Sequence, residues 1–321
     1  MQQHYISWWN LENLFNEEND PTRSVWLQSK LKSELKGWNT DVLSKKLSQL
    51  ATVIQLMNEG KGPDILGVCE VENKAVLEKL LEKLSSLERN YGIVLHDGED
   101  KRGIDVAFIY DKDKFIAAEQ FTHRVVKRNA TRDIFQVNFK TPMDKDLVII
   151  GNHWPARMPG TYESDPYRII AGETLSYWLK RITEIMGDDI GIIAMGDFND
   201  EPFSRSMTDY ALSTNNKLKV LYSRTSPRLY NLMATDIAEG IGSYYYSGPF
   251  LFDQLLVSKG LIKSTAPLKV VDGSAKVNNY ELMAKGSYKA PRRFGRPSRS
   301  SSYDPEGFSD HFSVSMLLEE K

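Results

Sequence analysis

The sequence has almost no cysteine, no long hydrophobic run and almost no net charge, and each of these absences narrows what the protein can be. Its single cysteine, Cys69, excludes an internal disulfide and a zinc cluster built from thiolates. No apolar run approaches the roughly 20 residues that a membrane-spanning helix needs. A formal net charge of -2 gives the whole molecule no attraction to polyanions, so nucleic-acid binding would require a local basic patch.

Signatures of several enzyme classes are missing as well. The sequence contains no Gly-x-Ser-x-Gly nucleophile elbow, no Walker phosphate loop and no Gly-x-Gly-x-x-Gly dinucleotide fingerprint. Its five histidines form no His-Glu-x-x-His pair, which disfavours a zinc hydrolase of that type. The chemistry must therefore come from other polar groups.

The 321 residues are predicted to form one domain, 1–321, because no Gly/Ser-rich or Pro-rich linker divides them. Residues 16–40 are charged and irregular and are predicted to be a surface excursion. An apolar stripe then predicts an amphipathic helix that starts at a Thr40 cap and ends near Asn58. We expect a monomer. The compartment stays open: cytoplasmic if Met1 is the native start, and secreted or periplasmic if a signal peptide was removed.

Polar side chains recur where short apolar runs end. The run 190–195, for example, is followed by Gly-Asp-Phe-Asn, which places Asp197 and Asn199 two residues apart at a strand exit. An Asx turn is the alternative interpretation of that pair taken alone. Across the chain, the same pattern gives one set of candidates: Asn10, Glu70, His153, Asp197, Asn199, Asp253, Asp310 and His311.

The chemical types in this set indicate one reaction. Carboxylate and amide oxygens are the ligands that Mg2+ and Mn2+ prefer, and two imidazoles can transfer protons. A lone histidine such as His153 is more often structural, but six polar strand ends in one chain are not expected of random surface residues. The set predicts metal-dependent attack of water on a phosphoester.

Basic residues offer weaker candidates. Arg168, near the start of a predicted helix over 167–185, is either a phosphate contact or a solvated side chain. Residues 285–303 carry six Lys or Arg and no acid. This basic loop is interpreted either as a mobile surface loop or as a clamp on the phosphates of a polyanion.

The order of these motifs resembles the endonuclease/exonuclease/phosphatase family, whose fold is that of deoxyribonuclease I. The resemblance extends over nearly the whole chain and rests on these elements: Trp9–Phe15, Gly67–Asn73, Arg102–Asp105, Gly151–His153, Gly196–Asn199, Phe252–Ser258 and Ser309–His311. It implies an α/β protein, a four-layer αββα sandwich with two mixed β-sheets packed face to face.

The resemblance also implies roles for the candidates. Glu70 would be the principal ligand of Mg2+ or Mn2+, helped by Asn10 and Asp310. Asp197 and Asn199 would orient water and phosphate, Asp253 would hold His311 as a base, and His153 would protonate the leaving oxygen or hydrogen-bond the phosphate. Arg132 resembles a phosphate-contacting arginine of the deoxyribonuclease branch.

The substrate is the least determined point. The favoured hypothesis is a nuclease acting on DNA or RNA, because of the basic loop and the Trp-Asn-Leu-Glu-Asn opening. A phosphatase or phosphodiesterase for small, inositol or lipid phosphates is the first alternative, and a catalytically silent phosphoester-binding module is the second. His153 stands where abasic-site endonucleases of the family resemble one another in having tyrosine, which argues against specialised repair of abasic DNA. Cys69 replaces a common glutamine and is expected to matter little.

Overall fold

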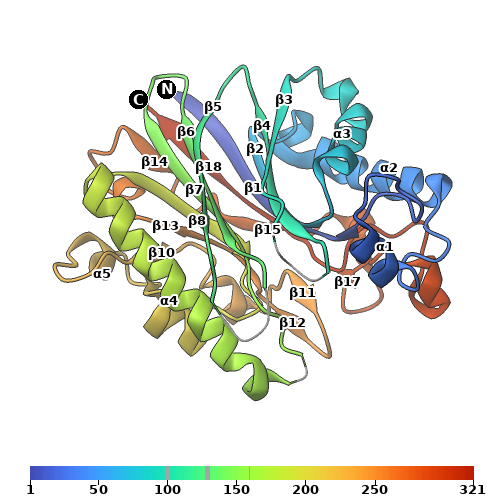
Figure 1. Ribbon diagram of the computed structural model, residues 1–321. Coiled ribbons are helices and arrows are strands. Elements are labelled where there is room, and N and C mark those ends of the chain that lie inside the picture. Colours follow the sequence, from blue (N-terminus) through green and yellow to red (C-terminus); the bar gives the residue numbers. More distant parts are fainter. Residues whose placement is uncertain (99–101, 127–130, 159) are drawn as a thin grey trace.

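Two mixed β-sheets packed face to face form the centre of the protein, as the computed structural model of residues 1–98, 102–126, 131–158 and 160–321 shows (Figure 1). Within these residues the first sheet has seven strands, which are, from one edge to the other, β14 (Leu268–Val270), β18 (Ser313–Glu320), β1 (Gln2–Leu14), β2 (Ile65–Val71), β4 (Asp105–Asp111) and β3 (Tyr91–Leu95), with β15 (Lys276–Asn278) also paired to β18.

The second sheet also has seven strands among the described residues. Their order is β5 (Ile116–His123), β6 (Ile134–Lys140), β7 (Asp146–His153), β8 (Gly191–Asp197), β13 (Asp253–Val257), β10 (Leu229–Asn231) and β9 (Ser213–Thr214). Two small hairpins lie outside both sheets: β11 (Tyr244–Tyr245) with β12 (Pro249–Phe250), and β16 (Ala284–Lys285) with β17 (Ala290–Pro291).

Helices cover the outer faces of the two sheets and complete the four layers. Helices α2 (Thr40–Leu56) and α3 (Lys74–Lys83) lie beside the first sheet, with α1 (Val25–Leu31) near its edge. The long helix α4 (Thr161–Met186) lies along the second sheet, and the short α5 (Lys217–Leu221) lies near β10 (Figure 1). The predicted αββα sandwich is confirmed. No described helix is long and apolar enough to cross a bilayer.

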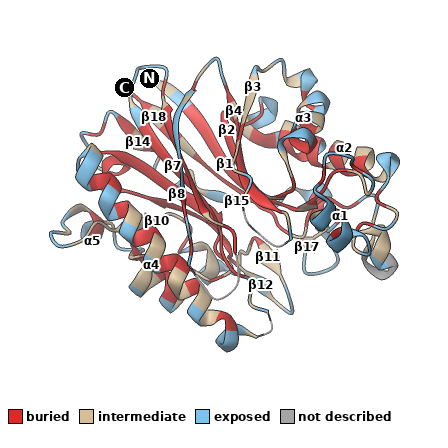
Figure 2. Ribbon diagram, viewed as in Figure 1, coloured by how far each residue is buried: buried red, intermediate tan, exposed pale blue. Residues whose placement is uncertain are grey.

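The central strands are buried on both faces, and this explains why they appear in the sequence as continuous apolar runs (Figure 2). Every residue of β8 is buried. Trp8 of β1 and Met195 of β8 pack directly against Gly67 of β2. A Cβ atom on Gly67 would lie only 2.5 Å from the Trp8 ring and 2.9 Å from Met195, so the space between the sheets is filled at this point. The strand ends are therefore held in fixed positions by a close-packed core.

Two local predictions need correction. Residues 16–40 are not a simple surface excursion, because they contain α1 and bury Trp38, whose ring packs edge-on against Phe294 of the basic loop at 5.9 Å. Burial of a few large apolar side chains is favourable enough to hold the segment against the fold, although many of its other residues are charged. The cap of α2 is Asn39 rather than Thr40, since its side chain accepts a 3.1 Å hydrogen bond from the backbone of Val42.

Candidate active site

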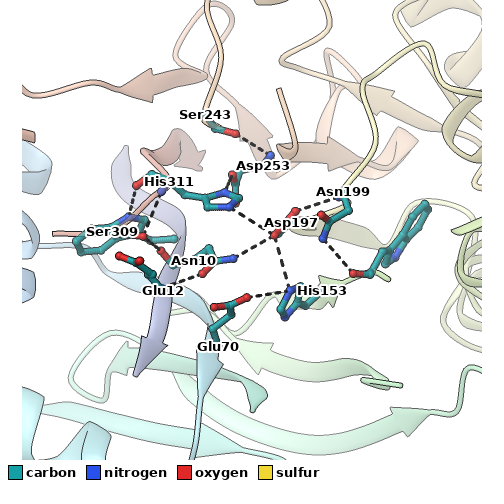
Figure 3. A network of polar contacts seen from close by, with 12 residues as sticks. Asn10, Glu12, Glu70, His153, Asp197, Asn199, Ser243, Asp253, Ser309 and His311 are labelled. Atoms are coloured by element: carbon teal, nitrogen blue, oxygen red, sulfur yellow. Dashed lines mark hydrogen bonds and ion pairs between the residues drawn. The ribbon is translucent and has the colours of Figure 1, made fainter. Parts of the chain in front are cut away.

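Strand pairing places the candidate residues at one edge of the sandwich. Asp197 at the end of β8 is the register partner of His153 in the parallel β7 and of Asp253 in the antiparallel β13. Asn10 of β1 lies in the other sheet, and its Nδ2 donates a 3.1 Å hydrogen bond to Asp197 Oδ2. Asp197 is thus the point where the two sheets meet (Figure 3).

Both candidate histidines face Asp197. The Nε2 atoms of His153 and His311 lie 3.8 Å and 3.9 Å from Asp197 Oδ2, and His153 Nε2 is also 3.6 Å from Glu70 (Figure 3). Asp253, which the sequence placed as the partner of His311, does contact it, with 2.6 Å between its Oδ2 and the ring Nδ1. The structure therefore brings together one carboxylate and two imidazoles that come from β7, β8 and the segment before β18.

The dyad of Asp253 and His311 is itself held rigidly. Trp8 Nε1 donates to the other carboxylate oxygen of Asp253 at 3.1 Å, and the backbone N–H of Asp253 donates to Ser243 Oγ at 3.0 Å. Ser309 Oγ donates to the backbone carbonyl of Asn10 at 2.6 Å and accepts from the N–H of His311 at 3.2 Å. The dyad is thereby tied to the strand that carries Asn10.

Four residues at this edge have a strained backbone. Glu12, Asn13, Glu70 and Asn199 all have left-handed φ values of 49° to 62°, a region that residues other than glycine seldom adopt. The first two fall where the pairing of β1 with β2 shifts register, and Glu70 falls at a similar shift between β2 and β4. Such irregularities re-aim side chains and are frequent next to functional sites.

The two histidines differ in protonation. Burial, reinforced by the positive charges of Arg132 and Arg102, holds the pKa of His153 well below its ordinary value. Burial also acts to lower the pKa of His311, but the carboxylates of Asp253 and Asp197 outweigh it and raise that pKa well above the ordinary value. The site therefore favours the neutral form of His153 and the protonated form of His311.

Two other carboxyl groups of the site, Asp197 and Asp310, have raised pKa values. Burial raises the pKa of Asp197 to about 6 in spite of the charge on His311. Burial and the carboxylates of Glu12 and Glu70 raise the pKa of Asp310 to about 7. Acids whose pKa values are shifted by burial and by neighbouring charges are typical of functional sites.

These acids fit a divalent cation. Glu70, Asp310 and Asn10 offer hard oxygen atoms in a region where carboxylates repel one another, and a cation would relieve that repulsion. Among the described residues, Cys69, His153 and Asp197 also offer ligand atoms within 4.8 Å of one another. Burial and the charge of Asp197, however, raise the pKa of the Cys69 thiol well above its ordinary value, so it stays protonated and is a poor ligand.

Seven of the eight strand-end candidates, all except the buried Asp253, form the floor of a cleft of about 1020 Å³ with two unlike walls. One wall, called here the aromatic wall, comprises Tyr244, Tyr246, Phe250 and Phe252 around the β11–β12 hairpin. The other, called the cationic wall, comprises Lys30, Arg293, Arg296 and Arg299 with Glu34. The aromatic wall was not predicted from the sequence, although the aromatic residues at 244–252 lie close together in it.

The aromatic wall continues from the dyad into the cleft. The Tyr244 ring lies 4.9 Å from the His311 ring and stacks on Phe252 at 5.3 Å, and Phe252 stacks on Phe250 at 5.2 Å. The guanidinium of Arg157 lies 4.7 Å from the Phe252 ring centroid. This wall can accept a planar ring beside the catalytic floor.

The structure does not bring Arg132 or Arg168 to the cleft as phosphate contacts. Arg132 is buried and donates to the backbone carbonyls of His153 and Trp154 at 3.2 and 2.8 Å, so it fixes the end of β7. The Arg168 side chain is fully buried, and its Nε lies 2.8 Å from Asp200. A substrate phosphate cannot reach a guanidinium that is used inside the fold.

Comparisons with known proteins agree with this geometry. A profile described as the Endonuclease/Exonuclease/phosphatase family matches residues 5–320. No curated protein sequence matches the chain significantly.

Similar structures have low sequence identity to this chain but nearly complete coverage. A humanized Danio rerio TDP2 carrying 14 mutations superimposes with a TM-score of 0.60 at 12% identity, over 99% of both chains. The human Nocturnin catalytic domain with bound sulfate gives 0.59 at 17%, over 99% of this chain and 94% of that one. A mannosyl-6-phosphatase from Bacteroides thetaiotaomicron gives 0.58 at 16%, over 98% and 99%. At these identities the three structures show a shared fold.

Proposed function

This chain belongs to the endonuclease/exonuclease/phosphatase family, and we propose that it hydrolyses phosphodiester bonds as a divalent-metal-dependent nuclease. The observation that carries the proposal is the convergence of His153, His311 and Asn10 on Asp197 at the floor of one cleft. Membership of the family supports action on phosphoester bonds. The walls of the cleft support the choice of substrate.

Glu70, Asp310 and Asn10 are the residues that would hold Mg2+ or Mn2+. A divalent ion there would neutralise charge on the phosphoryl oxygens. Asn10 already uses its side-chain oxygen to accept from the backbone of Glu12 at 2.9 Å, which fixes the orientation of the amide. Glu70 is likewise fixed, because its Oε2 accepts a 2.9 Å hydrogen bond from the backbone of Asn13.

Asp197 is placed to take a proton from the attacking water. With a pKa of about 6 it is ionised at neutral pH and still basic enough for proton transfer. The backbone N–H of Asn199 donates to its Oδ1 at 3.0 Å and Asn10 holds its Oδ2, so the carboxylate cannot rotate freely. Fixed orientation of the water relative to phosphorus is a large part of the rate gain in such reactions.

The protonated His311 is placed to stabilise negative charge on the phosphoryl group, with Asp253 holding the ring and its charge. Neutral His153, between Glu70 and Asp197, hydrogen-bonds the phosphate or the leaving oxygen. The attack is in line, with the water and the leaving oxygen on opposite sides of phosphorus.

The unlike walls favour a nucleotide ester over an isolated phosphate. The aromatic wall suits stacking of a base, and the cationic wall suits the phosphates of a backbone. One observation favours the alternative of a small phosphomonoester: much of the basic loop is neutralised locally, since Lys285 and Arg292 both pair with Asp304. The two hypotheses are separated by substrate choice.

The test compares hydrolysis of supercoiled plasmid, bis-(4-nitrophenyl) phosphate and 4-nitrophenyl phosphate in Mg2+, Mn2+ or EDTA. We expect metal-dependent nicking that outpaces both small esters, and a loss of about a hundredfold or more in His153→Ala. His96→Ala is the matched control, because His96 is a partly exposed histidine that does not line the cleft.

Each other outcome assigns a different function. Rapid turnover of 4-nitrophenyl phosphate with intact plasmid would replace the nuclease by a phosphatase. Binding of these esters without turnover in either metal would indicate the silent binding module. Nicking that survives His153→Ala unchanged would overturn the proposed centre.

A further inference from the structure

The cationic wall contains more positive charge than its own carboxylates neutralise. Arg296 and Arg299 both pair with Glu34, with N–O distances of 2.5 and 3.3 Å. Arg293 and the buried Lys46 both pair with Glu12, and Arg293 also interacts with Asp310. The lining of this wall has four cationic side chains and one carboxylate, Glu34, and a partly desolvated surface of this kind attracts anions.

The wall is built into the fold through Glu12. This carboxylate accepts hydrogen bonds from Arg293 Nε at 2.9 Å and from the backbone N–H groups of Phe294 and Gly295 at 2.8 and 3.1 Å. Lys46 Nζ lies 3.8 Å from Glu12 and donates to the carbonyl of Phe308 at 2.6 Å. Because Glu12 follows Asn10 by two residues in β1, the wall is fixed relative to the catalytic floor.

The guanidinium groups are consequently positioned before any ligand binds. The Arg296 side chain is only 14% exposed and reaches the cleft surface, whereas Arg293 is about half exposed. The planar fork of arginine matches the oxygens of a phosphate, and a side chain that is already ordered loses little entropy on binding one. The scissile phosphate occupies the floor, so these groups are available to a different anion.

We propose that the cationic wall is a subsite for a second phosphate of the substrate. This inference rests on the proposed phosphoesterase function and adds the substrate class: a phosphodiester that carries a further phosphate next to the scissile one. The cleft of about 1020 Å³ lies at the upper end of the size usual for small-molecule sites, which suits a nucleotide with two phosphates. A substrate with one phosphate leaves the wall unused.

The experiment compares two substrates with the same scissile bond, thymidine 5′-(4-nitrophenyl phosphate) and its 3′-phosphorylated form. We expect the 3′-phosphate to raise kcat/KM at least about tenfold, mainly by lowering KM, because each new contact is a charge-assisted hydrogen bond. In Arg296→Gln the ratio of the two kcat/KM values should fall toward one. A general loss of activity cancels in this ratio.

The matched control is Arg292→Gln. Arg292 belongs to the same segment but forms a two-pronged pair with Asp304 and does not line the cleft, so the ratio should stay at the wild-type value. Arg299→Gln serves as a second test variant, because its side chain is 62% exposed and its loss disturbs the fold least. Equal ratios in the wild type, Arg296→Gln and Arg299→Gln would overturn the subsite.

A binding measurement separates failure of the subsite from failure of the proposed function. Isothermal titration with thymidine 3′,5′-bisphosphate and thymidine 5′-phosphate needs no turnover. Tighter binding of the bisphosphate that is lost in Arg296→Gln supports the subsite even if neither ester is hydrolysed. Equal affinities overturn the subsite, whether or not the protein proves to be a phosphodiesterase.

Discussion

Metal affinity should depend on pH through Asp310. Burial and the neighbouring carboxylates of Glu12 and Glu70 raise the pKa of Asp310 to about 7 in the metal-free protein. A divalent ion binds the ionised carboxylate and must therefore displace a proton when the pH is below that value. The affinity should be constant above about pH 8 and should fall as the pH decreases through 7.

The size of the effect follows from the pKa. At pH 6, one unit below it, about nine molecules in ten carry the proton, so apparent affinity should be about tenfold weaker than at pH 8, or about 1.4 kcal/mol. Isothermal titration with Mn2+ at pH 6, 7 and 8 measures this directly. Repeating the titration at pH 7 in two buffers of different ionisation enthalpy should show release of about half a proton per ion.

Two variants identify the carboxylate responsible. Asp310→Asn removes the titrating group and should weaken binding while abolishing its pH dependence over this range. Asp304→Asn is the matched control, because Asp304 lies in the same segment but pairs with Arg292 and does not line the cleft. Equal affinity at pH 6 and pH 8 in the wild type, or an unchanged pH slope in Asp310→Asn, would refute the reasoning.

Three further predictions test other parts of the site. Asp253→Asn should lower kcat by about a hundredfold to ten-thousandfold with little change in KM, because an amide cannot stabilise the positive charge of His311. Steady-state kinetics on the preferred ester will show whether KM changes instead. Phe250→Leu should raise KM for thymidine 5′-(4-nitrophenyl phosphate) about fivefold or more, because the substitution removes a ring on which the base can stack. The KM for methyl 4-nitrophenyl phosphate, which has no base, should not change. Equal effects on both esters would exclude base stacking at this position. Arg168→Met should lower the free energy of unfolding by about 3 kcal/mol, because the buried carboxylate of Asp200 then keeps one of its two guanidinium partners, Arg157. Denaturant titration together with KM will show whether binding is affected in its place.

The fold was largely predictable because strong local patterns and global burial agree. The run 190–195 is apolar at nearly every position because β8 is covered on both faces, and the helix over 40–56 has a stripe that matches its one buried side. The 16–40 segment was mispredicted because a few large side chains, such as Trp38, determine burial while the many charged residues dominate its composition.

The floor of the site was also predictable, whereas its walls were not. Asp197 and His153 could be found because each ends a buried strand, and Asp253 because it is an acid within an apolar run. Arg168 failed as a candidate because a sequence cannot show that a guanidinium is paired inside the fold. For the same reason, the sequence could not distinguish Arg292, which pairs with Asp304, from Arg296, which lines the cleft.

The sequence by itself determined the family, several of the strands and the chemical types at their ends, because these depend on local periodicity and on short motifs. Tertiary structure alone decided which ends meet, which histidine keeps its proton and which arginines face the cleft. These properties depend on distances between residues far apart in the chain, as between Glu12 and Arg293 or Asp253 and His311. Burial then shifts the pKa of each titratable group in the site, and these groups become buried only when the two sheets pack together.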